Sequence, residues 1–161
     1  EAQFDSSRKA VAGIQELAKP AGEGAAISKQ FGDLDPKLRR NSELNSAAAE
    51  FKKNLDEVLG PPPPNYGTPV IPVDANYTSI RYVMGALRQV QGSMQSADLA
   101  PTPDQLKALD KYLAQEKSTL ANWERFVAAD LAGFNRKLKA AGLREIELQP
   151  KNRASGEPKS N

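Results

Sequence analysis

The fold is decided by residues 102–142, which read TPDQLKALDKYLAQEKSTLANWERFVAADLAGFNRKLKAAG. Thr102 followed by a proline, with Gln105 three positions after the threonine, is the signature of a helix N-terminus. Apolar residues then recur at spacings of three and four, or sums of these, at Leu106, Leu109, Leu113, Leu120, Trp123, Val127, Leu131, Phe134 and Leu138. This pattern predicts one long helix over about residues 103–141 that buries one side. Gly142 follows it as a stop signal, because glycine adopts the left-handed conformation found after helix ends.

Two more amphipathic stretches precede this helix. Residues 75–95 carry apolar side chains three and four positions apart, at Ile80, Val83, Leu87, Val90 and Met94. Residues 42–59 carry a second stripe of this kind, at Leu44, Ala48, Phe51, Leu55 and Val58. Gly60 and the prolines after it end this helix, because proline cannot continue one. The link over residues 96–101 is short, so the two helices that it joins should form an antiparallel hairpin.

Three glycines lie inside these predicted helices. Gly85 and Gly92 fall seven positions apart, on one side of their helix. Glycine in a helix interior costs stability in water, so we expect both to mark a close contact with a neighbouring helix. Gly133 should not break the longest helix, and we expect it to mark a close crossing or a bend.

The N-terminal third is predicted to contain a helix that stops early. A helix over about residues 5–19 is indicated by apolar positions at Phe4, Val11, Ile14 and Leu17. Helix breakers follow it closely, at Pro20, Gly22 and Gly24. Proline removes a hydrogen-bond donor and glycine weakens a helix. We therefore expect an interruption there, with one or two further helical turns in residues 25–31.

These patterns together predict an all-α fold, an antiparallel up-down bundle of about four helices. The bundle should occupy residues 1–148, with helices at about 5–19, 42–59, 75–95 and 103–141. A proline-rich extended connector, residues 60–74, should run along the bundle because its prolines exclude a helix. Residues 149–161 are polar and are predicted to form a separate C-terminal tail.

The residue types that are missing exclude several kinds of site. The 161 residues contain no cysteine and no histidine. This rules out disulfides, thiolate nucleophiles, zinc sites of Cys and His, and triads with a histidine base. Charges are balanced, with 22 Lys and Arg, 20 Asp and Glu, and a formal net charge of +2. This excess is too small to attract nucleic acid or anionic lipid strongly. No apolar run approaches the ~20 residues that a membrane span needs.

Two acids fall near the apolar stripe of the longest predicted helix. If Glu116 and Asp130 were buried, they could serve as a general acid or as oxygen ligands. We favour the simpler interpretation that each lies at the edge of the stripe and pairs with a Lys or Arg of a neighbouring helix. Trp123, the single tryptophan, is predicted to be part of the core. No catalytic residue, cofactor-binding residue or metal ligand is predicted, and the chain is not expected to be an enzyme.

Two further motifs have simple structural interpretations. The prolines at 61–64 could bind an aromatic-lined groove, but no basic residue flanks them closely, so we interpret them as a stiff spacer. Clusters of Lys and Arg occur at 37–40, 136–139 and 151–153. Acids are interspersed among them, and the aromatic residues fall mainly on the apolar stripes. The clusters are therefore interpreted as solvated helix ends, not as a surface for nucleic acid.

One part of the chain resembles a known family. It comprises SADLAPTPDQLKALDKYLAQ (96–115), a long helix, and DLAGFNRKLKAAGLREIEL (130–148). These stretches resemble the C-terminal helical region of bacterial sortilin-like, BNR-repeat β-propeller proteins, which are often labelled sialidase-like. The matching residues are 96–98, 100–102, 131, 134–135 and 140–143. The resemblance implies a module that follows a large propeller in a secreted or periplasmic bacterial protein. It also implies that any catalytic residues of the family lie in the propeller and that none lies here.

The function expected from the sequence is a non-enzymatic helical interaction or assembly module. Its partner would be a protein, either a β-propeller domain or other subunits of an assembly. Two alternatives stay open, a carboxylate-dependent glycan hydrolase and an independent envelope-associated binding protein. The first residue is Glu1, which fits either removal of a signal peptide or a piece of a longer protein.

Overall fold

The computed structural model of the chain describes residues 2–61, 78–95 and 100–149. Its elements are α1 (Ala2–Leu38), α2 (Ser42–Leu59), α3 (Ile80–Gln95), α4 (Pro103–Arg125), the π-helical segment η1 (Phe126–Leu131) and α5 (Ala132–Ala140). The residues in these ranges contain no strand, and the helices pack on one another. The predicted all-α bundle is thereby confirmed. Most of the predicted connector and tail lies outside the described residues, so their course and the boundary at residue 149 stay predictions.

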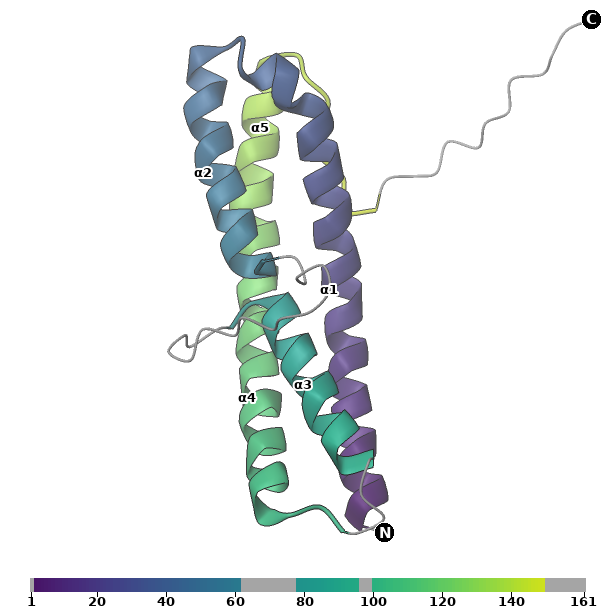
Figure 1. Ribbon diagram of the computed structural model, residues 1–161. Helices are drawn as coiled ribbons and strands as arrows, with labels where there is room; N and C mark the ends of the chain where they lie inside the picture. Colours follow the sequence, from purple (N-terminus) through teal and green to yellow (C-terminus); the bar gives the residue numbers. More distant parts are fainter. Residues whose placement is uncertain (1, 62–77, 96–99, 150–161) are drawn as a thin grey trace, which may run out of the picture.

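The helices form three columns (Figure 1). One column is α1, and a second consists of α4, η1 and α5, which together form one continuous rod parallel to α1. The third column contains α2 and then α3, which both run in the opposite direction to the other two. Each half of the bundle therefore has three helices around a shared core. The contacts and opposite directions of α3 and α4 confirm the predicted hairpin.

The structure corrects the prediction for the N-terminal third, because α1 passes unbroken through Pro20, Gly22 and Gly24. Its buried positions follow spacings of four and three with one gap of seven, at Ser6, Ala10, Gly13, Leu17, Pro20, Gly24, Ile27, Phe31 and Leu38. Pro20 and Gly24 thus belong to the buried stripe itself. Phe4, which was assigned to the stripe, is 67% exposed. Packing along the whole stripe offsets the local cost of the proline and the glycines, because tertiary contacts supply most helix stability in proteins.

Two glycines of α1 let the columns approach closely. A Cβ atom on Gly24 would overlap the side chain of Leu59 at the end of α2. A Cβ atom on Gly13 would lie 2.8 Å from Glu116 Oε2 of α4 and 3.1 Å from Leu87 Cδ1 of α3. Such distances are shorter than van der Waals contact between these atoms. A larger residue at either position would force these neighbouring side chains to shift.

The glycines that were expected to mark close contacts lie elsewhere. Gly85 and Gly92 are exposed, and a Cβ atom on either would meet nothing within 4 Å. The prediction of a close helix contact there is wrong. A Cβ atom on Gly133 would meet only Arg136 Nη2, at 3.8 Å, so there is no close crossing at this position either. The helix does continue through Gly133, as predicted.

The bounds of α2 and α3 agree with the prediction to different degrees. α2 has the predicted bounds, and Asn41 Oδ1 caps it by accepting hydrogen bonds from the backbone N–H groups of Glu43 and Leu44. α3 begins at Ile80 and not near residue 75, and Thr78 before it is not helical. All five predicted stripe positions of α3 are buried: Ile80, Val83, Leu87, Val90 and Met94.

The ends of the long rod also agree with the prediction, although its middle does not. Thr102 and Gln105 form the expected capping box at the start of α4. The π-helical segment η1 was not predicted. It buries both Phe126 and Leu131, five positions apart, whereas Val127 of the predicted stripe is only half-buried. A π-helical turn closes over five residues instead of four, so both large side chains can face the core.

Aromatic rings join the three columns in the half of the bundle that contains α2. The ring centroid of Phe31 lies 5.7 Å from that of Phe51 and 6.0 Å from that of Phe134. Phe51 and Phe134 stack at 4.5 Å with an interplanar angle of 11°. Trp123 stacks on Phe126 at 5.5 Å and is 5% exposed, which confirms its place in the core. Such ring pairs add to the stabilisation that burial alone provides.

Candidate functional site

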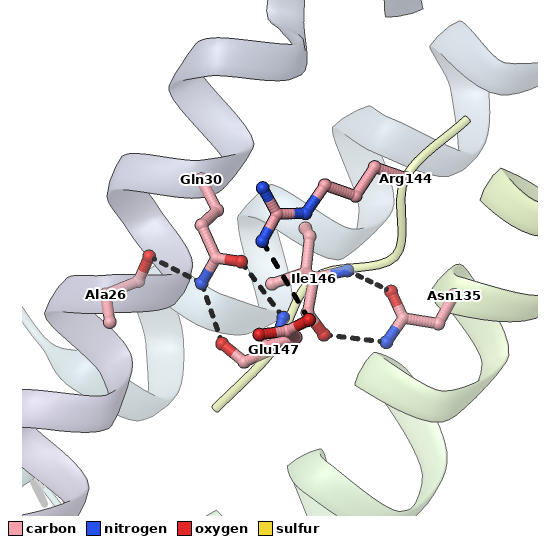
Figure 2. A network of polar contacts seen from close by, with 6 residues as sticks. All are labelled: Ala26, Gln30, Asn135, Arg144, Ile146 and Glu147. Atoms are coloured by element: carbon pink, nitrogen blue, oxygen red, sulfur yellow. Dashed lines mark hydrogen bonds and ion pairs between the residues drawn. The ribbon is translucent and has the colours of Figure 1, made fainter. Parts of the chain in front are cut away.

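Beyond α5 the chain reverses direction and returns along the bundle. Gly142 has a φ of 70°. The backbone N–H of Leu143 donates to Leu138 O at 2.9 Å, and that of Gly142 donates to Lys139 O at 3.0 Å. These two bonds form a Schellman motif, which confirms Gly142 as the predicted helix stop. Residues 143–149, called the C-terminal strap below, then lie between α1 and α5 (Figure 2).

Two side-chain amides hold the C-terminal strap by its backbone (Figure 2). Asn135 of α5 accepts from the N–H of Ile146 at 2.8 Å and donates to its carbonyl at 2.9 Å. Gln30 of α1 accepts from the N–H of Glu147 at 3.0 Å and donates to its carbonyl at 2.7 Å. Each amide thus makes the pair of bonds that a neighbouring strand would make in a sheet. We call Gln30 and Asn135 the amide clamp.

The amide clamp is supported from both sides. Gln30 Nε2 also donates to the carbonyl of Ala26 at 3.1 Å, which fixes the orientation of this amide. Ile146 is only 3% exposed and belongs to the core, while Leu143 and Leu148 are half-buried against it. Backbone hydrogen bonds and one fully buried side chain therefore anchor the strap.

Neither residue of the amide clamp was predicted as functional. A single polar amide on a helix surface does not contribute to the apolar periodicity of that helix, so the sequence pattern does not indicate its role. Asn135 lies in the stretch that carries the family resemblance, but no role came with it. The one available signal was the apolar pattern of Leu143, Ile146 and Leu148 after the helix stop at Gly142.

Glu116 lies deep between α1 and α4, not at the edge of the stripe. It is 8% exposed, and its Oε2 faces Gly13. Burial raises the pKa of the Glu116 carboxyl and the nearby Glu16 raises it further, while Lys117 lowers it. Among the described residues no Lys or Arg nitrogen lies within ion-pair distance of this carboxylate, so the predicted ion pair is wrong.

Asp130 of η1 also has a different partner from the one predicted. Asn54 Nδ2 of α2 donates to Asp130 Oδ1 at 2.6 Å, so an amide takes the place of the expected base. Glu116 and Asp130 lie on one continuous rod, about 20 Å apart at 1.5 Å per residue. The two carboxyls of a glycosidase lie roughly 5–10 Å apart. These two acids therefore do not form a hydrolytic pair.

A polar hollow of about 280 Å³ lies where α2 ends and α3 begins, opposite η1. Its polar lining residues are Asn54, Glu57, Thr78, Asn122, Arg125 and Asp130. Most of these groups bond to one another or to the helices around them. Arg125 Nη2 donates to Asn122 Oδ1 at 2.5 Å, and Thr119 Oγ1 donates to Thr78 O at 2.8 Å. These bonds fix the orientation of Asn122 and Thr78 within the hollow.

α1 and α4 begin, and α3 ends, at one end of the bundle, which is called the basal end below (Figure 1). Two large apolar side chains near this end are exposed. Phe4 is 67% exposed and Leu106 is 38% exposed. The prediction that Leu106 belongs to the buried stripe is therefore wrong. A hollow of about 700 Å³ lies beside Phe4, and Arg8, Val11 and other residues of α1 line it. The Arg8 guanidinium lies 5.6 Å from the centroid of the Phe4 ring. Aromatic and cationic groups thus lie together at this end.

Other candidate sites receive no support within the ranges that the structure describes. These residues contain no group of three or more acidic, Cys or His side chains placed to hold a metal ion. No described helix is long and apolar enough to cross a membrane. The bases of clusters 37–40 and 136–139 are exposed, as expected for solvated helix ends. The cluster at 151–153 and prolines 62–64 lie outside the described residues.

Comparison with known proteins adds no further assignment. No protein-family model, curated protein or solved structure matches this chain. The resemblance of its second half to the helical region of BNR-repeat proteins therefore stays a prediction, and function has to be argued from the geometry.

Proposed function

We propose that this chain is a non-enzymatic helical interaction or assembly module. The basal end is the observation that carries the proposal, because Phe4 is 67% exposed beside a hollow of about 700 Å³ and Leu106 is 38% exposed at the same end. An exposed aromatic side chain beside a hollow, with a polar residue such as Arg8 next to it, is a feature of many sites that a partner protein covers. The proposed partner is a β-propeller domain or another subunit of an assembly.

The geometry favours this function over glycan hydrolysis. A hydrolase of that kind needs two carboxyls on either side of one bond. Glu116 is packed against Gly13 inside the bundle, and Asp130 is bonded to Asn54 about 20 Å away along the rod. Binding to an anionic membrane surface is disfavoured by the net charge of only +2.

The wider setting of the module is also a proposal. The likeness of residues 96–148 to the C-terminal helical region of sortilin-like, BNR-repeat proteins supports a secreted or periplasmic location in a bacterial protein. That likeness is the only support for this location. In such a protein the module would pack against the propeller and would position it in an assembly.

Sedimentation velocity tests the interaction role. The chain is measured from micromolar to near-millimolar concentration, alone and mixed with a propeller domain of a BNR-repeat protein. We expect association in at least one of these series. Replacing Phe4→Ser together with Leu106→Ser should weaken it at least about tenfold, because apolar anchors at the centre of an interface often contribute 2 kcal/mol or more.

A matched control separates the surface from general effects on the fold. Ala128→Ser changes an exposed residue of η1, far from the basal end, and should leave the association unchanged. A chain that remains a monomer at the highest concentration and has no affinity for a propeller would contradict the proposed function.

A further inference from the structure

We infer that the groove between α1 and α5, which the C-terminal strap fills, is a binding site for an extended peptide segment of another protein chain. The strap acts there as a built-in competitor for the partner segment. The inference goes beyond the proposed function, since it concerns the half of the bundle away from the basal end. Variants at Phe4 and Leu106 leave this groove intact, so the two proposals can fail separately.

The groove recognises backbone and not a particular sequence. All four bonds of the amide clamp go to the N–H and C=O groups of two consecutive residues, Ile146 and Glu147. Since consecutive residues of an extended chain point these groups to opposite sides, one amide on each helix is sufficient to hold both. Any extended segment offers the same groups, except where a proline removes the N–H.

Side-chain selection is strongest at the position of Ile146, and the half-buried Leu143 and Leu148 add weaker apolar contacts. This side chain is 3% exposed, whereas the neighbouring Arg144 and Glu147 have side chains that are 64% and 48% exposed. Arg144 Nη2 lies 3.8 Å from Glu147 Oε1, and an ion pair of this length and exposure contributes little to stability. The partner segment is therefore an extended peptide with an aliphatic residue at the position of Ile146 and apolar residues favoured at the positions of Leu143 and Leu148.

The groove also offers contacts that the strap leaves unused. A hollow of about 460 Å³ lies beside the end of the strap, lined on the rod by Val127, Leu131, Ala132 and Asn135. Leu148 borders this hollow and is only half-buried. A partner segment with a larger apolar side chain at the position of Leu148 would bury more surface here. A segment from another chain can thereby bind more tightly than the strap does.

The strap can leave the groove without unfolding the helices. It joins α5 through Gly142, and it is held by four neutral hydrogen bonds, two of them exposed, by one deeply buried side chain and by two half-buried leucines. Segments with so few buried contacts open locally while the rest of a fold stays intact. While it is closed, a tethered strap competes at an effective concentration in about the millimolar range.

A labelled peptide tests the site on the full-length chain. The probe is fluorescein-LREIELQ, the sequence of residues 143–149, and binding is followed by fluorescence anisotropy. In the variant Ile146→Asp the strap loses its buried anchor and the groove becomes free. We expect this variant to bind the probe at least about tenfold more tightly than the wild-type chain does.

Two controls test whether the amide clamp is what binds the probe. A probe that is N-methylated at the residue equivalent to Ile146 loses the N–H that Asn135 accepts, so it should bind at least about tenfold more weakly. Methylation at the residue equivalent to Glu145, for whose N–H the structure records no acceptor, should change binding little. Adding Asn135→Ala to the Ile146→Asp variant should weaken binding of the unmodified probe by a similar factor.

Each outcome decides the inference. If Ile146→Asp keeps the helical circular dichroism of the wild type but does not bind the probe, the strap is a fixed part of the fold and the inference is wrong. If that variant loses helicity, Ile146→Gly empties the same position without adding a charge and is measured instead. Equal binding of both methylated probes, or strap exchange between two copies of the wild-type chain in place of peptide binding, would also overturn the inference.

Discussion

Two columns span the whole bundle: α1, and the rod of α4, η1 and α5. Local helix propensity predicts that α1 is the less regular of the two, but the structure shows the reverse. α1 contains Pro20 and Gly24 but is α-helical from Ala2 to Leu38. The rod has no proline after Pro103, but it changes to a π-helix over Phe126–Leu131. The spacing of the buried residues therefore determines the type of each helix more than local helix propensity does.

The two stripes explain this difference. The buried positions of α1 are spaced by threes and fours, with the proline and the glycine among them, so an α-helix buries them all. In the rod, Phe126 and Leu131 are five positions apart and both are buried. An α-helix cannot turn both toward one core, whereas a π-helical turn can.

The largest effect is expected from moving a proline into the regular part of the rod. Ala121 is exposed in α4, so Ala121→Pro removes no core contact, but it breaks a helical hydrogen bond and clashes with the preceding turn. The free energy of unfolding should fall by about 3 kcal/mol or more. Urea denaturation followed by circular dichroism measures the change.

The reciprocal variant removes the proline from α1. Pro20→Ala regains a backbone donor in α1 but loses the contacts of a buried ring, so stability should change by less than about 1 kcal/mol. If Ala121→Pro were as mild as Pro20→Ala, the rod would tolerate proline as well as α1 does, and the proposed role of the buried stripe would be wrong.

A smaller effect is expected from two glycines of α1 that differ only in their surroundings. Gly24→Ala places a methyl group against the buried Leu59 and should destabilise the fold by about 1–3 kcal/mol, as overpacking does. Gly22 has open space around it, and Gly22→Ala should stabilise the fold by about 0.5–1 kcal/mol. Thermal or urea unfolding of both variants should give changes of opposite sign. Changes of the same sign would show that helix propensity alone decides both.

The smallest effect concerns Glu116 of α4, whose carboxylate packs against Gly13 of α1. Because burial raises its pKa, the folded chain binds this proton more tightly than the unfolded chain does. The resulting stabilisation is complete below the ordinary pKa of 4.5 and is lost as the pH rises through the folded-state value. Glu116→Gln imitates the neutral form, so it should match the wild type in acid and be more stable near neutral pH, by on the order of 1 kcal/mol.

Urea unfolding across this pH range, with the exposed Glu124→Gln as control, measures the difference. The control should follow the wild type at every pH. A Glu116→Gln variant with no pH-dependent advantage would mean that the carboxylate is solvated in the folded chain.

The fold could be predicted from the sequence wherever caps and periodic stripes agreed. The bounds of α2, the capping box at Thr102 and the stop at Gly142 all follow from local signals that the structure confirms. The length of α1 could not be predicted, because Pro20 and Gly24 were interpreted as breakers and not as members of a stripe. The need for glycine at position 24 depends on Leu59, which is distant in sequence.

The sites could be predicted far less well. Glu116 and Asp130 were identified as the acids near the core, but their surroundings depend on α1 and α2, and neither has the basic partner that was expected. The amide clamp joins Gln30 to residues near the C-terminus. Such a pairing over long separation leaves no trace in local periodicity.

The break between α2 and α3 has a mechanical consequence. Two of the three columns are continuous along the axis and resist extension, while the third is interrupted at mid-height (Figure 1). Arg81 Nη1 of α3 donates to the carbonyl of Gly60 at 2.9 Å across this interruption, and η1 lines the hollow beside it, so the π-helical part of the rod lies opposite the junction of α2 and α3. We therefore expect the molecule to bend about its middle, on the side of the interrupted column, more readily than it stretches along its axis.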